Sequence, residues 1–209
     1  MGQRESHTSV RDPEATRARI LEAALREFAT HGFAGARVDM IAKAASINKR
    51  MLYHYFGDKE ALFREVLRRK IAQRKAFLAQ APKNPFESLP DWAELMANDQ
   101  EWIRLLQWEA LQTGGSRKVI DEARRRDSFR CAVERIKEQQ AAGTIPKDLD
   151  AGQLLVSMLA LTAYPFAFPH LARLATGLRV SSTDFQKRRA EFLRKLGARL
   201  KNTSRKVEQ

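Results

Sequence analysis

The segment spanning residues 38–59, VDMIAKAASINKRMLYHYFGDK, constrains the fold of this 209-residue chain more than any other part. Val38, Ile41 and Ala42 fall at helical spacing, so they can share one buried face. The pattern stops at the small residue Ser46 and restarts two residues later. Two short helices joined by a tight turn, the second with polar donors at its start, form a helix-turn-helix. The second helix of that motif fits the major groove of DNA.

The second of these helices carries the side chains that can contact DNA. Lys49 and Arg50 can donate to guanine O6 and N7 or to phosphate. Asn48 can pair with adenine or cap the helix, and His54 can meet a base edge or the DNA backbone.

The sequence around this segment resembles a known family. The motif F-A-x-x-G-F ends the preceding helix, I-A-x-x-A lies in the first helix of the motif, and L-Y-x-Y-F-x-x-K-E-x-L crosses into the helix that follows. Because these parts occur in order over residues 16–67, the stretch resembles the N-terminal domain of the TetR family of transcriptional regulators.

The resemblance implies further DNA contacts. Tyr53 and Lys59 align with family positions that contact phosphate, and Arg37 stands where the family often has a phosphate-binding threonine. Met51 replaces a small hydroxyl residue that is frequent in the family, so it either makes an apolar contact to DNA or packs in the core. The complete predicted DNA-binding set is Arg37, Asn48, Lys49, Arg50, Tyr53, His54 and Lys59.

Net charge does not identify the function. The chain carries +13, but residues 1–60 hold 10 Lys/Arg against 8 Asp/Glu, whereas residues 170–209 hold 11 against 3. The excess can attract polyanions over long range, yet most of it lies outside the predicted DNA-reading segment. The single cysteine, Cys131, excludes an internal disulfide, and no apolar run approaches the roughly 18–20 residues of a membrane span. We therefore expect a cytoplasmic protein without a membrane partner.

The rest of the chain predicts an all-α protein. Residues 12–57 form a three-helix, helix-turn-helix DNA-binding domain, residues 58–80 a linking helix, and residues 86–202 further helices. By resemblance, these further helices form an effector-binding and dimerisation domain. The linking helix alternates an apolar face with a basic one made of Arg64, Arg68, Arg69, Lys70, Arg74 and Lys75. Pro165 and Pro169 bend or break the most hydrophobic stretch, AGQLLVSMLALTAYPFAFPHL.

Aromatic residues and methionines of the second domain are candidates for an effector pocket, although they also fill ordinary cores. They are Trp92, Met96, Trp102, Leu106, Trp108, Phe129, Met158, Tyr164 and Phe168. Few charged residues lie among them, so we expect a largely apolar ligand, with Glu109 and His170 as polar contacts. The last helix repeats apolar residues that we assign to a dimer interface: Phe185, Phe192, Leu193, Leu196 and Leu200.

Catalytic motifs are absent from the sequence, and no cofactor or metal ion is expected. The four histidines lie far apart and lack metal-ligand spacing, and there is no phosphate-binding glycine loop. The sequence predicts a TetR-type regulator that is not an enzyme. We expect it to act as a homodimeric repressor of double-stranded, pseudo-palindromic operator DNA, which a small-molecule effector releases. Two alternatives remain open: a non-specific basic DNA-coating protein, and a ligand carrier without sequence-specific DNA reading.

Overall fold

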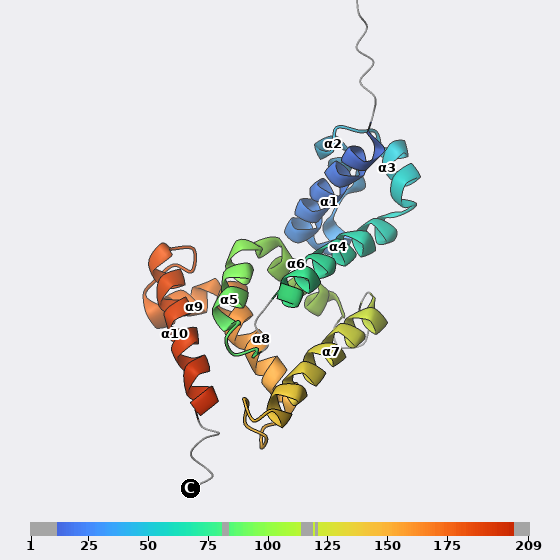
Figure 1. Ribbon diagram of the computed structural model, residues 1–209. Helices are drawn as coiled ribbons and strands as arrows, with labels where there is room; N and C mark the ends of the chain where they lie inside the picture. The colour runs from blue at the N-terminus through green and yellow to red at the C-terminus, as the bar shows by residue number, and fades with distance from the viewer. Residues whose placement is uncertain (1–11, 81–83, 114–118, 120, 203–209) are drawn as a thin grey trace, which may run out of the picture. The chain divides into compact units, whose positions relative to one another are not determined.

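The computed structural model describes residues 12–80, 84–113, 119 and 121–202, and all the regular structure in these residues is helical (Figure 1). The helices are α1 (Pro13–Gly35), α2 (Val38–Ala44), α3 (Lys49–Phe56), α4 (Lys59–Gln80), α5 (Leu89–Asn98), α6 (Gln100–Thr113), α7 (Glu122–Ala141), α8 (Ala151–Ala167), α9 (Pro169–Thr176) and α10 (Thr183–Asn202). The predicted all-α class is confirmed.

The chain divides into two compact units, Met1–Arg69 and Lys70–Gln209, so that the boundary falls inside α4. The predicted domain limits at residues 57 and 86 lie on either side of this boundary and stay predictions. Residues 81–85, which separate the predicted linking helix from the predicted second domain, lie mostly outside the described part.

Local capping groups set the ends of the helices in the first unit. Asp12 precedes α1, and its Oδ1 accepts hydrogen bonds from the backbone N–H groups of Glu14 and Ala15 at 2.9 and 3.3 Å. Near the other end of α1, Gly32 adopts a φ of 68°, which interrupts the helical backbone as glycine allows. Asp58 caps α4 through a 2.7 Å bond from the Ala61 N–H group.

The core of the first unit lies between α1, α2, α3 and α4. Phe28 of α1 is fully buried, and its ring meets that of Phe63 of α4 edge-on at 4.8 Å. Ile41 of α2 and Leu52 of α3 are also fully buried. One apolar residue from each helix thus fixes α2 and α3 on the α1–α4 pair.

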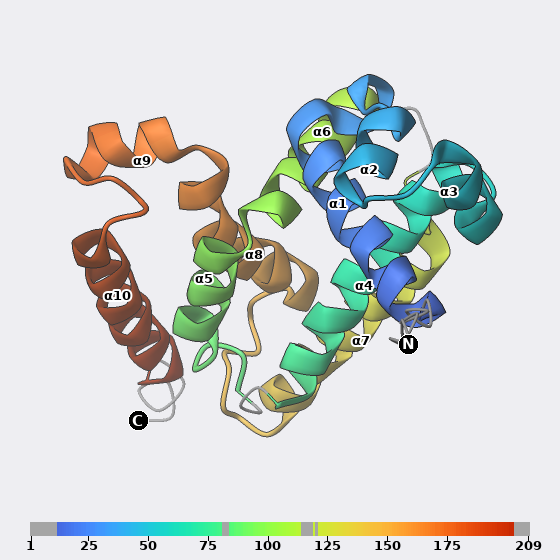
Figure 2. The same ribbon diagram turned by 90° about the horizontal axis from the view of Figure 1, so that it is seen from above.

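In the second unit, α5 packs against both α10 and α8 (Figures 1 and 2). A cluster of buried side chains joins these helices to α7: Phe86, Leu89, Ala93, Ile136, Ile145, Ala151, Met158 and Leu193. Burial of such side chains stabilises each by about 1.5–3 kcal/mol relative to exposure. The hydrophobic contacts of α5 and α10 therefore hold together segments that are about a hundred residues apart in the chain.

One sequence-based expectation about single helices is wrong and another is confirmed in part. Lys70 and Arg74 were assigned to the basic face of the linking helix, yet both are 9% exposed because each pairs with a buried carboxylate. The predicted interruption of the apolar stretch is confirmed at Pro169, where α9 begins after a break of 90° at Phe168, whereas Pro165 lies buried inside α8 and does not end that helix.

Among the described residues, no single helix is long and apolar enough to cross a membrane. The helices α8 and α9 reach the required length and composition only as a pair, and they meet at a bend of 90°.

Candidate nucleic-acid interface

The turn between α2 and α3 is a hydrogen-bonded helix end. The N–H of Ile47 donates to the carbonyl of Ala42 at 3.0 Å, and the N–H of Ser46 donates to that of Lys43 at 3.1 Å. This pair of bonds is the Schellman arrangement, which needs a left-handed residue after the helix. Ser46 takes that position with a φ of 55°, and Ala45 beside it is buried. The turn thereby fixes the angle at which α3 leaves α2.

The helix α3 has one buried and one exposed face. Leu52 is fully buried and Phe56 is 9% exposed, which anchors the helix in the unit. Its other face presents side chains that can donate hydrogen bonds: Lys49, Arg50, Tyr53 and His54, all of which are exposed. The Lys49 ammonium lies 5.9 Å from the centre of the Tyr53 ring, one helical turn away. The predicted basic and polar face of the reading helix therefore exists on a rigid support.

Asn48 and Met51 each had two interpretations from the sequence. The Oδ1 of Asn48 accepts a 2.8 Å hydrogen bond from the Met51 N–H group, so Asn48 caps α3. The amide NH2 of Asn48 takes no part in that bond and projects from an exposed residue. Met51 is half-buried, which is compatible with a contribution to the packing at the edge of α3.

Arg37 and Lys59 flank the reading helix and already make contacts within the unit. The Arg37 guanidinium pairs with Asp39 at 3.0 Å but remains 70% exposed. The Lys59 ammonium donates to the carbonyl of Ala34 at 3.2 Å and lies 5.1 Å from the centre of the Phe33 ring. The carbonyl bond uses one of the three donors of the ammonium group, so the remaining donors can bind phosphate.

Arg17 contacts the buried residue Phe56 of α3, a role that the sequence pattern did not indicate. Its guanidinium lies 5.0 Å from the centre of the Phe56 ring and donates to the Glu65 carboxylate at 2.9 Å. Arg17 of α1 therefore links the last residue of α3 to α4. Only the tertiary packing brings these three residues together.

The predicted effector residues do not share one environment. Met96 and Met158 are buried, the latter in the core cluster. Tyr164 and Phe168 are 49% and 42% exposed, and their ring centroids are 5.0 Å apart. Trp92, Leu106 and Trp108 are half-buried, whereas Phe129 is 47% exposed.

Polar contacts join α6 to the helices around these aromatic residues. The amide NH2 of Gln107 donates to the carbonyl of Ala167, the last residue of α8, at 2.7 Å. The Glu109 carboxylate accepts two bonds from Arg125 of α7, at 2.7 and 2.8 Å, and both side chains are largely buried. A polar contact from Glu109 to a ligand would therefore compete with an existing ion pair.

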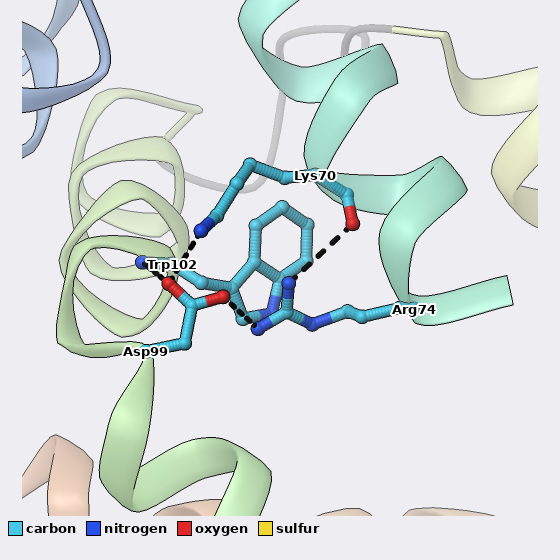
Figure 3. Close-up of polar contacts among 4 residues, drawn as sticks. All are labelled: Lys70, Arg74, Asp99 and Trp102. Carbon is cyan, nitrogen blue, oxygen red and sulfur yellow. Dashed lines mark hydrogen bonds and ion pairs between the residues drawn. The ribbon is translucent and has the colours of Figure 1, made fainter. Parts of the chain in front are cut away.

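Asp99 is the centre of a buried ionic cluster between α4 and α6 (Figure 3). Its carboxylate pairs with Lys70 at 2.6 Å and with Arg74 at 2.8 Å, and it accepts a 3.2 Å bond from the Trp102 N–H group. The Arg74 guanidinium also lies 4.2 Å from the centre of the Trp102 ring. Trp102 is thus a partner of Arg74, and the aromatic pattern that suggested a ligand contact did not indicate this role.

The cluster shifts the pKa values of Asp99 and Arg74. Burial disfavours the Asp99 carboxylate, but hydrogen bonds from Lys70 and Arg74 and their charges outweigh burial, so the pKa of Asp99 lies below its usual value. Desolvation lowers the pKa of Arg74, and the charge and hydrogen bond of Asp99 oppose this effect. The Nε of Arg74 is buried without a hydrogen-bond partner.

The predicted dimer residues on α10 point in different directions. Leu193 is fully buried and Phe185 is 5% exposed, so both belong to the interior of the single subunit. Leu196 and Leu200 are half-buried, and Leu200 packs against the core cluster. Phe192 is 51% exposed.

In the described part of the chain, no group of three or more His, Cys, Asp or Glu residues could hold a metal ion. The geometry of α2, its turn and α3 instead defines a helix-turn-helix protein of the DNA-binding class.

Comparison with known proteins identifies the family. Residues 20–66 match the family model described as bacterial regulatory proteins, tetR family, and residues 89–199 match the tetracyclin repressor-like C-terminal domain. The HTH-type transcriptional repressor SCO4008 of Streptomyces coelicolor is 35% identical over 180 residues, covering 84% of this chain and 91% of that protein. The HTH-type transcriptional repressor NicS of Pseudomonas putida is 35% identical over 116 residues, covering 51% and 55%.

Solved structures agree with this assignment. The crystal structure of SCO4942 from Streptomyces coelicolor aligns with a TM-score of 0.74 at 26% identity, covering 88% of this chain and 97% of that one. Salmonella enterica GusR shares the fold with a TM-score of 0.69 at 22% identity, covering 92% and 98%. The chain belongs to the TetR family of transcriptional regulators and is a DNA-binding regulator.

Proposed function

We propose that this regulator is a homodimeric repressor that reads a pseudo-palindromic operator with α3 and leaves it when a small, largely apolar effector binds. The observation that carries the proposal is the exposed donor face of α3, supported by the buried Leu52 and Phe56. The name of the relative SCO4008, a transcriptional repressor, supports the direction of control. A regulator that binds operator DNA acts where that DNA is, so we place its action in the cytoplasm.

Lys49 and Arg50 are the proposed base-reading residues, with Asn48 and His54 beside them. Arg37, Tyr53 and Lys59 are proposed to bind phosphate. In a twofold dimer, two α3 helices would enter major grooves about 34–36 Å apart. The operator should therefore contain two half-sites related by inversion.

A face on α8 and α10 supports the proposed dimer. Val156 and Leu159 of α8 are 59% and 38% exposed, and Phe192 of α10 is 51% exposed. The two helices are joined by a hydrogen bond from the Arg189 guanidinium to the carbonyl of Leu161. That guanidinium also lies 5.4 Å from the centre of the Phe192 ring, which restrains its orientation. A second copy covering these side chains would bury apolar area that a single subunit leaves in water.

The proposed effector site lies around the exposed aromatic pair of α8 and the adjoining face of α6. Tyr164 and Phe168 supply apolar ring faces, and we include Trp108 of α6, which follows Gln107, the residue that bonds to the end of α8. Effector and operator then affect each other's binding reciprocally, since each favours a different conformation of the dimer. Replacing Tyr164 with alanine should weaken effector binding, so that more effector is needed to release a fluorescent operator. The affinity for the operator in the absence of effector should stay unchanged.

Operator selection tests the DNA-binding part of the proposal. Sequencing a random duplex pool after several rounds of binding at near-physiological salt should reveal an enriched inverted repeat. The double variant Lys49→Ala/Arg50→Ala should bind that repeat at least about tenfold more weakly, because each lost base contact costs about 1–3 kcal/mol.

The matched control is Arg26→Ala/Arg69→Ala, which removes two exposed charges from the same unit but outside α3. This control should retain operator binding within a few-fold at constant salt. Equal losses in the two double variants, or enrichment of no motif, would favour a non-specific DNA-coating protein. Ligand binding that is unaffected by DNA would favour a carrier.

A further inference from the structure

A surface pocket of about 240 Å³ lies between α9 and the segment that follows it, and its lining includes His170, which the sequence suggested as a polar contact for the effector. Its walls come from Pro169, His170 and Arg173 of α9 and from Arg179, Val180 and Ser181. Gly177, with a φ of 72°, ends α9 in the left-handed conformation, and the chain then turns back along the helix. This turn brings the second arginine into the same pocket as the first.

The pocket is cationic and has no counter-charge from its own chain segment. Two arginines and a histidine are among the residues that line it, and no Asp or Glu occurs between Asp150 and Asp184. Within the described residues, no salt bridge engages Arg173 or Arg179, whereas Arg125 of α7 and Arg74 of α4 have acidic partners. Two like charges that share a concave surface raise the local concentration of anions.

The chemistry of the walls fits a small oxyanion. A guanidinium presents a planar fork of N–H donors that matches the geometry of a carboxylate or a phosphate. Ser181, a residue with a hydroxyl donor, also lines the pocket, while Pro169 and Val180 supply apolar surface. The volume lies below the roughly 300–1,000 Å³ of sites for drug-sized ligands, so the pocket suits a small anion.

We propose that the α9 pocket is a binding site for a small molecule with a carboxylate or phosphate group, distinct from the proposed effector site on α6 and α8. Arg173 and Arg179 hold the oxyanion, and Ser181 donates to it.

Calorimetric titration of the full chain with inorganic phosphate, with benzoate and with neutral benzamide, all at constant ionic strength, tests the site. We expect saturable 1:1 binding of at least one of the two anions and none of benzamide. Preference between phosphate and benzoate identifies the natural headgroup. The double variant Arg173→Gln/Arg179→Gln should weaken binding at least about tenfold, since it removes two charged donors.

The matched control Arg188→Gln/Arg194→Gln removes the same two charges from exposed positions on α10 and should bind the anion as the parent does. Circular dichroism and thermal unfolding verify that both double variants fold. No saturable binding of either anion, or equal weakening in the two variants, overturns the proposal. If the pocket variant binds no less oxyanion but loses operator affinity, the arginines contact DNA phosphate instead. Operator binding is measured in a separate experiment, so the anion-site proposal and the proposed function are tested independently.

Discussion

Ser46 holds a backbone conformation that L-amino acids disfavour. Its φ of 55° places it in the left-handed region, where a side chain costs roughly 1–2 kcal/mol relative to glycine. Glycine would relieve this cost but lose more chain entropy on folding, by about 0.5–1 kcal/mol. We therefore expect Ser46→Gly to raise the free energy of unfolding in urea by about 0.5–1 kcal/mol. In contrast, Ser128→Gly, on the exposed middle of α7, should lower it by about 0.5 kcal/mol.

Asp99 makes stability depend on acid pH. The pKa of this carboxyl is lowered in the folded protein, so its contribution is complete above the unfolded-state pKa of about 3.9 and is lost as pH falls through the folded-state pKa. We expect the free energy of unfolding to fall steeply below about pH 4. In Asp99→Asn that decline should be shallower, as urea unfolding from pH 7 to pH 3 would reveal.

The same substitution should cost about 3–5 kcal/mol at neutral pH, because Lys70 and Arg74 would stay buried without a counter-charge. The control Asp127→Asn breaks an exposed pair with Arg130 and should cost under about 1 kcal/mol. Similar losses for the two variants would mean that the cluster adds no more than a surface ion pair.

At the scale of elements, α10 packs tightly against the segment before α5. A Cβ atom at Gly197 would lie 2.6 Å from the Phe86 carbonyl oxygen, a backbone atom that cannot rotate away. Gly197→Ala should therefore destabilise the protein by about 1–3 kcal/mol, although alanine favours the helix itself. Gly35→Ala at the end of α1, where the nearest atom would be 3.4 Å away, should change stability by under about 0.5 kcal/mol. Thermal unfolding of both variants checks this difference.

At the scale of the whole molecule, the proposed dimer depends on the outward face of α8 and α10. Phe192→Asp places a charge on that face without touching the core, so it should give a folded monomer in size-exclusion chromatography with light scattering. Operator affinity should fall with it, because two linked reading heads bind far more tightly than one. Phe129→Asp, at a similarly exposed phenylalanine of α7, should remain a dimer. A dimeric Phe192→Asp would place the interface elsewhere.

Local sequence determined the reading head almost completely. The helix breaks around α2 and α3, the caps at Asp12, Asn48 and Asp58, and the exposed face of α3 all follow from contacts within a few residues. Such contacts depend on the spacing and type of neighbouring residues, which is why the segment was also enough to indicate the family. The site residues themselves stay predictions until DNA binding is measured.

Only the tertiary structure decided which polar and apolar side chains of the second unit face inward. On α10, the neighbours Phe192 and Leu193 have 51% and 0% exposure, a difference that depends on where α5 lies. On α4, Lys70 and Arg74 are buried rather than exposed because both form ion pairs with Asp99, which is 25 or more residues away in the chain. The α9 pocket likewise needs the turn at Gly177. These outcomes depend on long-range packing, and no pattern within a single helix encodes its partner.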